Sequence, residues 1–527
     1  MYDILIKNAY IYDGSGNSPY LSNILIKDGI IVKIDNTYGE AFCEIDATGF
    51  VTAPGFIDPH THYDNTILHD KQMIAPLCQG VTTVITGLCG LGTVPLKQRD
   101  IPEVNKLNSG MVSYRDSFNY TATNVEEYLH QADGAAVNVA TAIGHIPLRI
   151  SAGGFHCTDY IKLDEKMKSL LRENLAMGAV GFSIGLDYFP AHSSVVSTNE
   201  LIDLNKIVAE ENAIFLAHVR PNGPSDGVME GNKEVCSIAA SLGVKTHVLH
   251  TRTLYPITCG KPEVISEVFE KAISKGADIS VESYPYFGGQ TYGIYYLPVW
   301  AQKGDTKEII RRLRIPEVRS AITENCEALV YYKPARFAYV KHHPEYEGHS
   351  LSYIAKSRGQ KVGEMLADIL IESDLGVSIT SADGVPDAYA NSQLLDDFMF
   401  LLQKAYYTIG SDSMDCGSHT HPRAFGSYAK VLRLTREYGY SLEKLIYKLT
   451  KFNADRFGLV KRGFLSEGNF ADINIFKYND VYDKATYEIP RTPPEGIKYV
   501  IVNGRVALFD GCPSGNLAGR SLKRNRA

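Results

Sequence analysis

Short apolar runs recur through the middle of the chain, and several are followed by a longer segment with helical periodicity. The apolar runs lie at residues 55–59, 81–87, 136–144, 179–185, 213–219, 245–251, 278–286 and 406–411. Amphipathic helical patterns lie at residues 164–177, 198–211, 230–242 and 261–274. Strands that alternate with helices are typical of a parallel sheet, and eight strands are the number that a (β/α)8 barrel requires. The pattern therefore predicts an α/β fold built on a TIM-like barrel.

Both ends of the chain carry strand patterns instead. Residues 2–8 and 23–34 have strand character near one end, and residues 471–476 and 500–506 have it near the other. We expect residues 1–54 and 465–527 to form one small β-sandwich domain beside a barrel of residues 55–464. Residues 288–358 interrupt the alternation of strands and helices and are too long for a simple loop, so we expect an inserted subdomain there.

Composition narrows the class of protein. The 527 residues are 44% hydrophobic and 21% charged, which is typical of a globular protein. The formal net charge of -7 argues against binding to nucleic acid or to an acidic membrane, and no apolar run approaches the roughly 18 residues of a membrane span. Nine scattered cysteines and the absence of a signal-peptide pattern favour the reducing cytoplasm. The basic residues 520–526 are expected to form a solvated tail.

Two histidines spaced i, i+2 follow the first apolar run. In an extended strand His60 and His62 point to the same face and can reach one metal ion together. Such a pair in isolation is as consistent with a polar loop as with a metal site. The metal site is favoured by position, because the chemistry of a TIM barrel lies at the carboxyl ends of its strands. Cys89, His218 and His250 also lie at the ends of predicted strands, as does Asp412.

Each of these residues has a structural interpretation as well. Cys89 could be a buried apolar side chain, although the glycines beside it indicate a tight turn that presents a thiolate. His218 alone is typical of a structural histidine, but it matches His250 on the next strand. Asp412 is suited to take a proton from an attacking water and return it to a leaving amine, the alternative being a helix N-cap. Arg252 suits a substrate carboxylate, and a structural ion pair is an equally good interpretation.

Several motifs resemble the amidohydrolase superfamily, and within it the D-aminoacylase (N-acyl-D-amino-acid deacylase) family. The resemblance covers nearly the whole chain. The His-x-His and closing motifs are shared by the superfamily, whereas the Cys-Gly, Tyr-Pro-Tyr and His-Pro-Arg motifs point to the D-aminoacylase branch. These motifs are residues 53–62, 80–84 with 89–90, 138–145, 181–188, 284–286, 410–412, 421–423 and 468–472.

The resemblance implies a set of zinc ligands, a base and a substrate pocket. Cys89, His218 and His250 would bind one zinc ion tightly, and the two histidines of the His-x-His motif would form a weaker second site. Asp412 aligns with the catalytic base of the family. The candidates for substrate binding by motif position are Arg252, Tyr286, Arg423 and Tyr188.

The activity that this resemblance implies is hydrolysis of the amide bond of a small N-acyl-D-amino acid, which releases a carboxylic acid and a free D-amino acid. Arg252 stands where the family often has lysine, and Glu282 where it has aspartate. A second possibility is a cyclic-amide hydrolase such as a hydantoinase or dihydroorotase, which usually has a bridging lysine that is absent after the fourth strand here. A third is a non-catalytic scaffold, which the complete ligand set disfavours.

Overall fold

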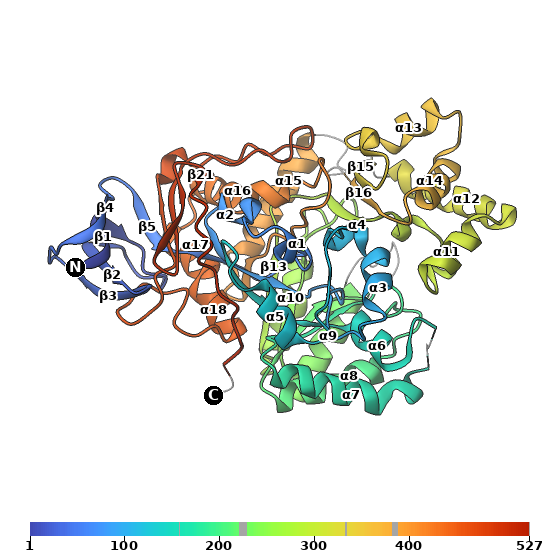
Figure 1. The fold of residues 1–527 in the computed structure, drawn as a ribbon, viewed down its shortest axis with the longest axis horizontal. Coiled ribbons are helices and arrows are strands. Elements are labelled where there is room, and N and C mark those ends of the chain that lie inside the picture. Colours follow the sequence, from blue (N-terminus) through green and yellow to red (C-terminus); the bar gives the residue numbers. More distant parts are fainter. Residues whose placement is uncertain (157–158, 221–228, 333–334, 382–387, 526–527) are drawn as a thin grey trace.

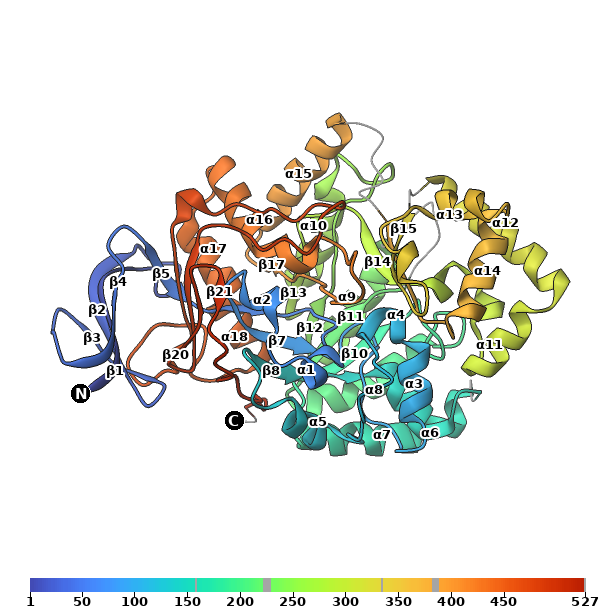
Figure 2. The ribbon, with the colours of Figure 1, turned by 45° about the horizontal axis from the view of Figure 1, so that its top comes forward.

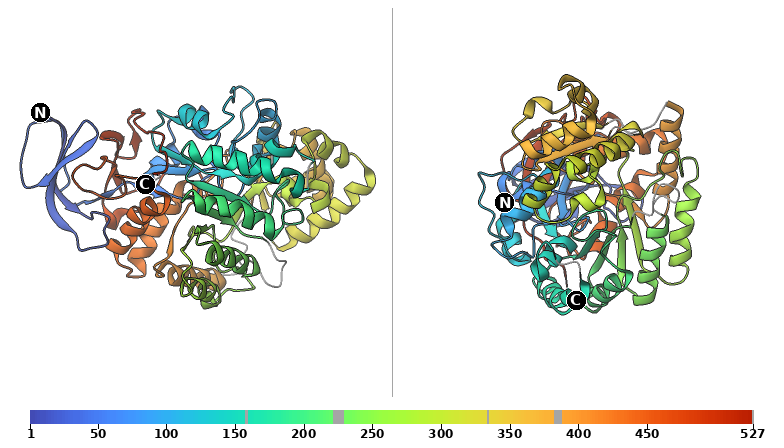
Figure 3. Two further views of the ribbon diagram at one scale, coloured as in Figure 1. Left: turned by 90° about the horizontal axis from the view of Figure 1, so that it is seen from below. Right: turned by 90° about the vertical axis from the view of Figure 1, so that its right-hand side faces the viewer.

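The structure is a computed structural model of the 527-residue chain, and it describes residues 1–156, 159–220, 229–332, 335–381 and 388–525. The molecule is elongated. A sheet of the first strands lies at one end, parallel strands with their helices lie in the middle, and helices α11–α14 lie at the other end (Figure 1). The left view of Figure 3 shows the same separation. Among the described residues, no helix combines the length and the apolar composition that crossing a membrane requires.

The middle of the molecule contains two parallel sheets. One has the order β6-β7-β8 and the other the order β9-β10-β11-β12-β13-β17. Each of the eight predicted apolar runs contains a strand, and β8 and β9 share one run. The strands are β6 (Phe56–Asp58), β7 (Val81–Thr86), β8 (Asn138–Thr141), β9 (Ile143–Gly144), β10 (Gly181–Gly185), β11 (Ile214–His218), β12 (Lys245–Val248), β13 (Ile279–Ser283) and β17 (Tyr407–Ile409). The predicted α/β fold is therefore confirmed.

The two sheets adjoin each other on both sides. Only Ala142 separates β8 from β9 along the chain. On the other side, the segments that follow β6 and β17 are joined by backbone hydrogen bonds, from His62 N to Ser413 O (2.7 Å) and from Asp412 N to His60 O (2.9 Å). These bonds bring the carboxyl ends of β6 and β17 together.

Helices cover the parallel strands, whose residues are almost all buried, as in other parallel sheets. The predicted helical patterns correspond to helices in the structure. Ser197 illustrates how they begin, because its side chain accepts a hydrogen bond from Glu200 N at the start of its helix. The helices that match these patterns are α7 (Tyr160–Ala176), α8 (Thr198–Glu210), α9 (Met229–Leu242) and α10 (Pro262–Ile273), and helices α16 (Arg423–Glu437) and α17 (Leu442–Leu449) follow β17.

Strands from both ends of the chain form one nine-stranded sheet with its own apolar core. The two sets meet where β5 pairs with β18 in antiparallel register, Ala53 opposite Asn474. The strands are β1 (Tyr2–Ile11), β2 (Tyr20–Lys27), β3 (Ile30–Asp35), β4 (Ala41–Asp46), β5 (Val51–Pro54), β18 (Ile473–Phe476), β19 (Ile497–Val502), β20 (Arg505–Phe509) and β21 (Cys512–Pro513).

A segment with its own small antiparallel sheet lies between β13 and β17, and Figure 2 shows it at the far end from the N-terminal strands. Its central strand is β16, which pairs with both β14 and β15 and lies beyond residue 358, the expected boundary. The elements are β14 (Gly289–Tyr292), α11 (Thr306–Leu313), α12 (Pro316–Tyr332), β15 (Ala335–Val340), α13 (Leu351–Ser357), α14 (Val362–Glu372) and β16 (Val377–Ser381).

The expectation of a solvated C-terminal tail at residues 520–526 is wrong for the backbone of residues 520–525, which is hydrogen-bonded to other segments, and residue 526 lies outside the described residues. Arg520 O accepts from Val139 N (3.0 Å), Leu522 N donates to Val139 O (2.7 Å), and Arg524 N donates to Gly178 O (3.0 Å). The guanidinium of Arg524 is buried and donates to Glu211 O (2.7 Å). Its many donors match backbone carbonyls, so this segment lies along the amino ends of the strands, while Arg520, Lys523 and Asn525 remain exposed to solvent.

Candidate metal centre

Six side chains predicted to carry the chemistry meet at the carboxyl ends of the parallel strands. They form two groups in which all candidate ligand atoms lie within 4.8 Å of one another, and Cys89 belongs to both. Each side chain ends or follows a strand that the apolar pattern predicted. The first group is His60, His62, Cys89 and Asp412, and the second is Cys89, His218 and His250.

The distances inside the groups suit one metal ion each. Cys89 Sγ lies 3.3 Å from His60 Nε2 and 3.5 Å from His250 Nε2. His218 Nδ1 lies 3.0 Å from His250 Nε2. Ligands around a tetrahedral zinc ion stand roughly 3.3–3.8 Å apart, given metal–ligand bonds of about 2.0–2.3 Å. The side chains therefore already have the spacing that shared coordination needs.

The chemistry of these groups also suits a metal. Neither ring nitrogen of His62 has a hydrogen bond of good geometry within the described part of the chain, although the ring is buried. Burial alone would raise the pKa of Cys89, but the rings of His60 and His218 bring that pKa well below its usual value. Thiolate and imidazole are ligands that zinc prefers.

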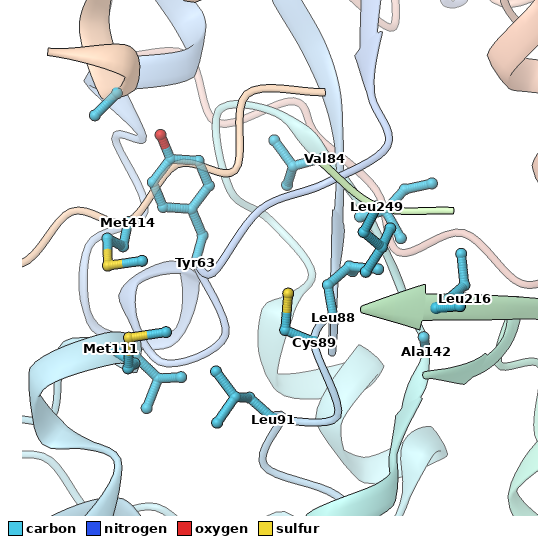
Figure 4. Close-up of a cluster of buried hydrophobic side chains, with 14 of the residues drawn as sticks. Tyr63, Val84, Leu88, Cys89, Leu91, Met111, Ala142, Leu216, Leu249 and Met414 are labelled. Atoms are coloured by element: carbon cyan, nitrogen blue, oxygen red, sulfur yellow. The ribbon is translucent and has the colours of Figure 1, made fainter. Parts of the chain in front are cut away.

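Apolar neighbours enclose the thiolate. Figure 4 shows Cys89 between Leu88 and Leu91, among other buried apolar side chains. A Cβ atom on Gly90 would lie 2.5 Å from Gly185 N, so the turn that carries Cys89 rests directly on β10. This close contact requires glycine after the cysteine.

Three residues of the centre have left-handed backbone conformations that non-glycine residues rarely adopt. The φ angles are +52° at Cys89, +36° at His250 and +51° at Asp412. Such strained conformations gather at functional sites, where the surrounding structure holds them in place. Each of these residues comes after a strand, so the turn of the backbone directs the side chain toward the other ligands.

Asp412 lies between the histidines and an arginine. Its Oδ1 is 3.1 Å from His62 Nε2 and 3.3 Å from His60 Nε2, and its Oδ2 is 2.8 Å from Arg423 Nη1. Burial alone would raise the pKa of this carboxyl, but Arg423 and His60 lower it well below its usual range. The residue before it is also fixed, because Ser411 N and Oγ both donate to Asp58, at 3.0 and 2.5 Å.

The predicted substrate-binding residues lie in two places. The guanidinium carbons of Arg252 and Arg423 are 4.5 and 4.6 Å from the centroid of the Tyr284 ring. The Tyr188 ring is 5.5 Å from the ring of the ligand candidate His218. The Tyr286 ring instead lies against His421, at 5.5 Å, with Lys430 Nζ 3.9 Å from its centroid. Tyr284 therefore lies against both arginines.

Two carboxylates that sequence reasoning did not select hold the far sides of the histidines. His60 Nδ1 is 2.7 Å from Glu282 Oε1, and His218 Nε2 is 3.0 Å from Asp187 Oδ2. Such contacts orient metal-binding histidines and set the ring nitrogen that carries the proton. One signal was present for Glu282: it is an acidic residue in the middle of a predicted strand run.

Comparison with known proteins finds a matching family model and several similar proteins. A model of the amidohydrolase family matches residues 44–220. The D-aminoacylase of Alcaligenes xylosoxydans xylosoxydans is 29% identical over 532 residues, which cover 100% of this chain and 98% of the relative. A crystal structure of a D-aminoacylase, described as defining a novel subset of amidohydrolases, superposes with a TM-score of 0.80 at 26% identity and covers 99% of this chain and 100% of its own.

A second solved structure carries ligands. It is an N-acyl-D-glutamate deacylase of Bordetella bronchiseptica in complex with zinc and a phosphonate inhibitor that mimics the tetrahedral intermediate. Its TM-score is 0.79 at 26% identity, with 99% of both chains covered. The chain is therefore similar over its whole length to the D-aminoacylases, and its residues 44–220 match the amidohydrolase family.

Proposed function

We propose that the chain is a zinc-dependent hydrolase of N-acyl-D-amino acids that releases a carboxylic acid and a free D-amino acid. The observation that carries this proposal is the pair of ligand groups that share Cys89, with the Asp412 carboxylate beside two of the histidines. The relatives named D-aminoacylase and the zinc complex of an N-acyl-D-glutamate deacylase support it.

The residues present fit zinc in two positions. Cys89, His218 and His250 would hold one ion tightly, and Cys89 with the His60 and His62 pair would hold a second more weakly. A bound zinc ion supplies a Lewis acid that activates water and polarises the scissile carbonyl.

Asp412 is the proton carrier in this proposal. It accepts a proton from the water that attacks the amide carbon, and it then delivers a proton to the leaving amine. The ion pair with Arg423 keeps the carboxylate ionised before the attack, as a base must be. The left-handed backbone of Asp412 and the hydrogen bonds between Ser411 and Asp58 fix its position.

Recognition of the substrate rests on the arginines and tyrosines near the centre. Arg252 would bind the carboxylate of the amino acid, and stacking on Tyr284 restricts the directions in which its donors point. Arg423 and Tyr188 border the same region. The Tyr286 ring packs against His421, two residues before Arg423.

The same family contains cyclic-amide hydrolases, which are the second candidate. Their bridging lysine has no counterpart after β10, where Gly185, Leu186 and Asp187 follow one another. A linear amide is therefore favoured. A scaffold without activity is disfavoured because all proposed ligands are present and close together.

We further propose that the two parallel sheets form one (β/α)8 barrel, since the backbone hydrogen bonds between the segments after β6 and β17 join their free edges. The nine-stranded sheet, from residues 1–54 and 465–527, would be a separate β domain, and the segment inserted between β13 and β17 would form a subdomain at the mouth of the barrel.

The test is amine release from N-acetyl-D- and N-acetyl-L-amino acids, with hydantoin and dihydroorotate alongside, using zinc-loaded protein. Release from D-substrates alone is expected. Ring opening without deacylation would transfer the chain to the cyclic-amide hydrolases, and zinc-loaded protein inert on every compound would contradict the proposed substrate class.

A further inference from the structure

One buried carboxylate touches both ligand groups of the metal centre. Glu282, on β13, is 0% exposed, and its Oε1 accepts hydrogen bonds from two donors. His60 Nδ1 lies at 2.7 Å and the backbone N–H of His250 at 2.8 Å. His60 belongs to the first ligand group and His250 to the second. A single oxygen atom therefore joins the two groups outside the metal positions themselves.

The hydrogen bond to His60 determines the orientation of that ring and which of its nitrogens is left to bind a metal ion. A carboxylate oxygen only accepts hydrogen bonds, so His60 Nδ1 carries a proton and Nε2 is the ring nitrogen left to bind a metal ion. The Nε2 atom faces Cys89 Sγ and Asp412 Oδ1, both at 3.3 Å. Glu282 thus selects the tautomer and the ring orientation in which His60 can be a ligand.

The bond to His250 acts on the backbone instead. His250 has a φ of +36°, a conformation that needs support from its surroundings. Its N–H donates to the Glu282 side chain, and the next residue, Thr251, donates its N–H to the Glu282 main-chain carbonyl at 2.9 Å. The same residue therefore holds the turn that directs the His250 ring toward Cys89 and His218.

The surroundings of Glu282 are shaped to this carboxylate. A Cβ atom added to Gly410 would lie 2.5 Å from Glu282 Oε2, so the strand next to it leaves room for the carboxylate by having no side chain there. Oε2 has no hydrogen-bond partner within the described residues, which leaves Oε1 as the oxygen that makes both contacts. The length of the glutamate side chain sets the distance to both histidines at once.

We propose that Glu282 is the positioning residue that holds the two ligand groups in the arrangement that metal binding needs. Loss of its carboxylate would then weaken metal binding in both groups together. The proposal rests on the zinc assignment made above and not on the choice of substrate. It concerns metal binding, and it therefore has a readout that does not require turnover.

The experiment measures zinc in E282A, E282D, E282Q and the wild-type protein. Zinc content is measured by elemental analysis, zinc affinity by competition with a chromogenic chelator, and ligand geometry by the visible and thiolate charge-transfer bands of the cobalt-substituted protein. Residues that hold a metal ligand typically change metal affinity about 10–100-fold when they are replaced. We expect that loss in E282A and in E282D, whose shorter side chain withdraws the oxygen, with altered cobalt spectra. E282Q keeps an acceptor and should lose less than about 10-fold.

The matched control is E200Q. Glu200 is also 0% exposed and its Oε1 is 2.8 Å from His145 Nε2, but this pair lies on helices α6 (His145–Gly153) and α8, and neither residue belongs to a ligand group. E200Q should keep the zinc affinity and cobalt spectrum of the wild type even if it unfolds at a lower temperature. Wild-type zinc affinity in both E282A and E282D, or an equal loss in E200Q, would overturn the proposal. If E282A does not accumulate as folded protein, E282D and E282Q still separate the two outcomes.

The proposed substrate class can be contradicted separately from the proposed role of Glu282. A wild-type protein that binds zinc but hydrolyses no N-acyl-D-amino acid would contradict the substrate class and leave the role of Glu282 intact. If the wild-type protein hydrolyses these substrates while E282A and E282D bind zinc normally, the proposed role of Glu282 is contradicted and the substrate class stands.

Discussion

Arg423 Nη1 lies 2.8 Å from Asp412 Oδ2, and both side chains are buried. The residue that the sequence suggested for substrate binding is thus also the ion-pair partner of the proposed base. Two further nitrogens of the same guanidinium, Nε and Nη2, have no partner among the described residues. Arg423 can therefore hold Asp412 ionised and still offer donors to a substrate.

Replacing Asp412 by asparagine should remove turnover and leave zinc bound. General acid–base catalysis contributes about 10²–10⁴-fold, so kcat for N-acetyl-D-amino acids should fall by at least that range. The control is D415N, because Asp415 is in the same loop but pairs with Arg491. Measured by amine release and zinc analysis, a D412N protein with near-normal kcat would show that another group carries the proton.

Replacing Cys89 by serine should affect metal binding in both groups at once, because this residue is common to them. Residues that merely orient a ligand change affinity about 10–100-fold, so loss of the shared thiolate should cost more. C416S is the control: Cys416 is also buried, but its pKa is raised by burial and its Sγ contacts Ser109 O. Retention of the full zinc content by C89S after dialysis would contradict the assignment of the thiolate.

Replacing Arg252 by methionine should weaken recognition of the substrate carboxylate. Hydrogen bonds to charged groups contribute about 1.5–3 kcal/mol, so kcat/KM should fall roughly 10–100-fold, mainly through KM. R252K keeps the charge but not the planar pair of donors, so its kcat/KM should lie between those of the wild type and R252M. R319M, which removes an ion pair with Asp368 in the inserted segment, should leave KM unchanged. An unchanged KM in R252M would instead favour a structural role for this arginine.

Lys448 predicts a pH dependence of stability. Its side chain is 4% exposed, Nζ donates to Lys404 O and Tyr407 O at 2.6 Å, and burial lowers its pKa from 10.5 to about 7. Between about pH 7 and 10.5 the unfolded chain keeps a proton that the folded chain has released, so stability should rise with pH in that window. The rise is at most about 1.4 kcal/mol per pH unit.

The measurement is the free energy of unfolding in urea at pH 7, 8.5 and 10, for the wild type and K448M at equal zinc concentration. The wild type should gain stability relative to K448M as the pH increases. K451M, which removes a lysine paired with Asp455 at the surface, should show no such trend. A constant difference between wild type and K448M would mean that Lys448 stays charged in the folded chain.

The strands, the helices and the ligands were predictable because each leaves a local signal. Buried parallel strands read as apolar runs, and the ligand candidates stand directly after them. Asp187 leaves no such signal, and the position of Glu282 inside a predicted strand run does not show which residues it contacts. Glu282 contacts a histidine 222 residues away and Asp187 one 31 residues away, so only the fold brings them together.

Two other differences have equally specific reasons. Tyr284 and Tyr286 have the same parity along the chain, so alternation cannot tell which one stacks on the arginines. The inserted segment extends past its expected boundary because β16 pairs with strands that precede it by many residues. In both cases the deciding interaction is long-range.

Residues 519–525 are the last of the described chain to leave the ribosome, and they cover strand ends made several hundred residues earlier. During synthesis, the carbonyl of Gly178 and the backbone polar groups of Val139 therefore lack these hydrogen-bond partners until the C-terminal segment has been made. Ser521 Oγ also donates to Leu129 O in the last turn of α5 (Val125–Ala132). A bulky fusion attached directly after residue 525 would compete with this late docking, whereas one placed before Tyr2 would not.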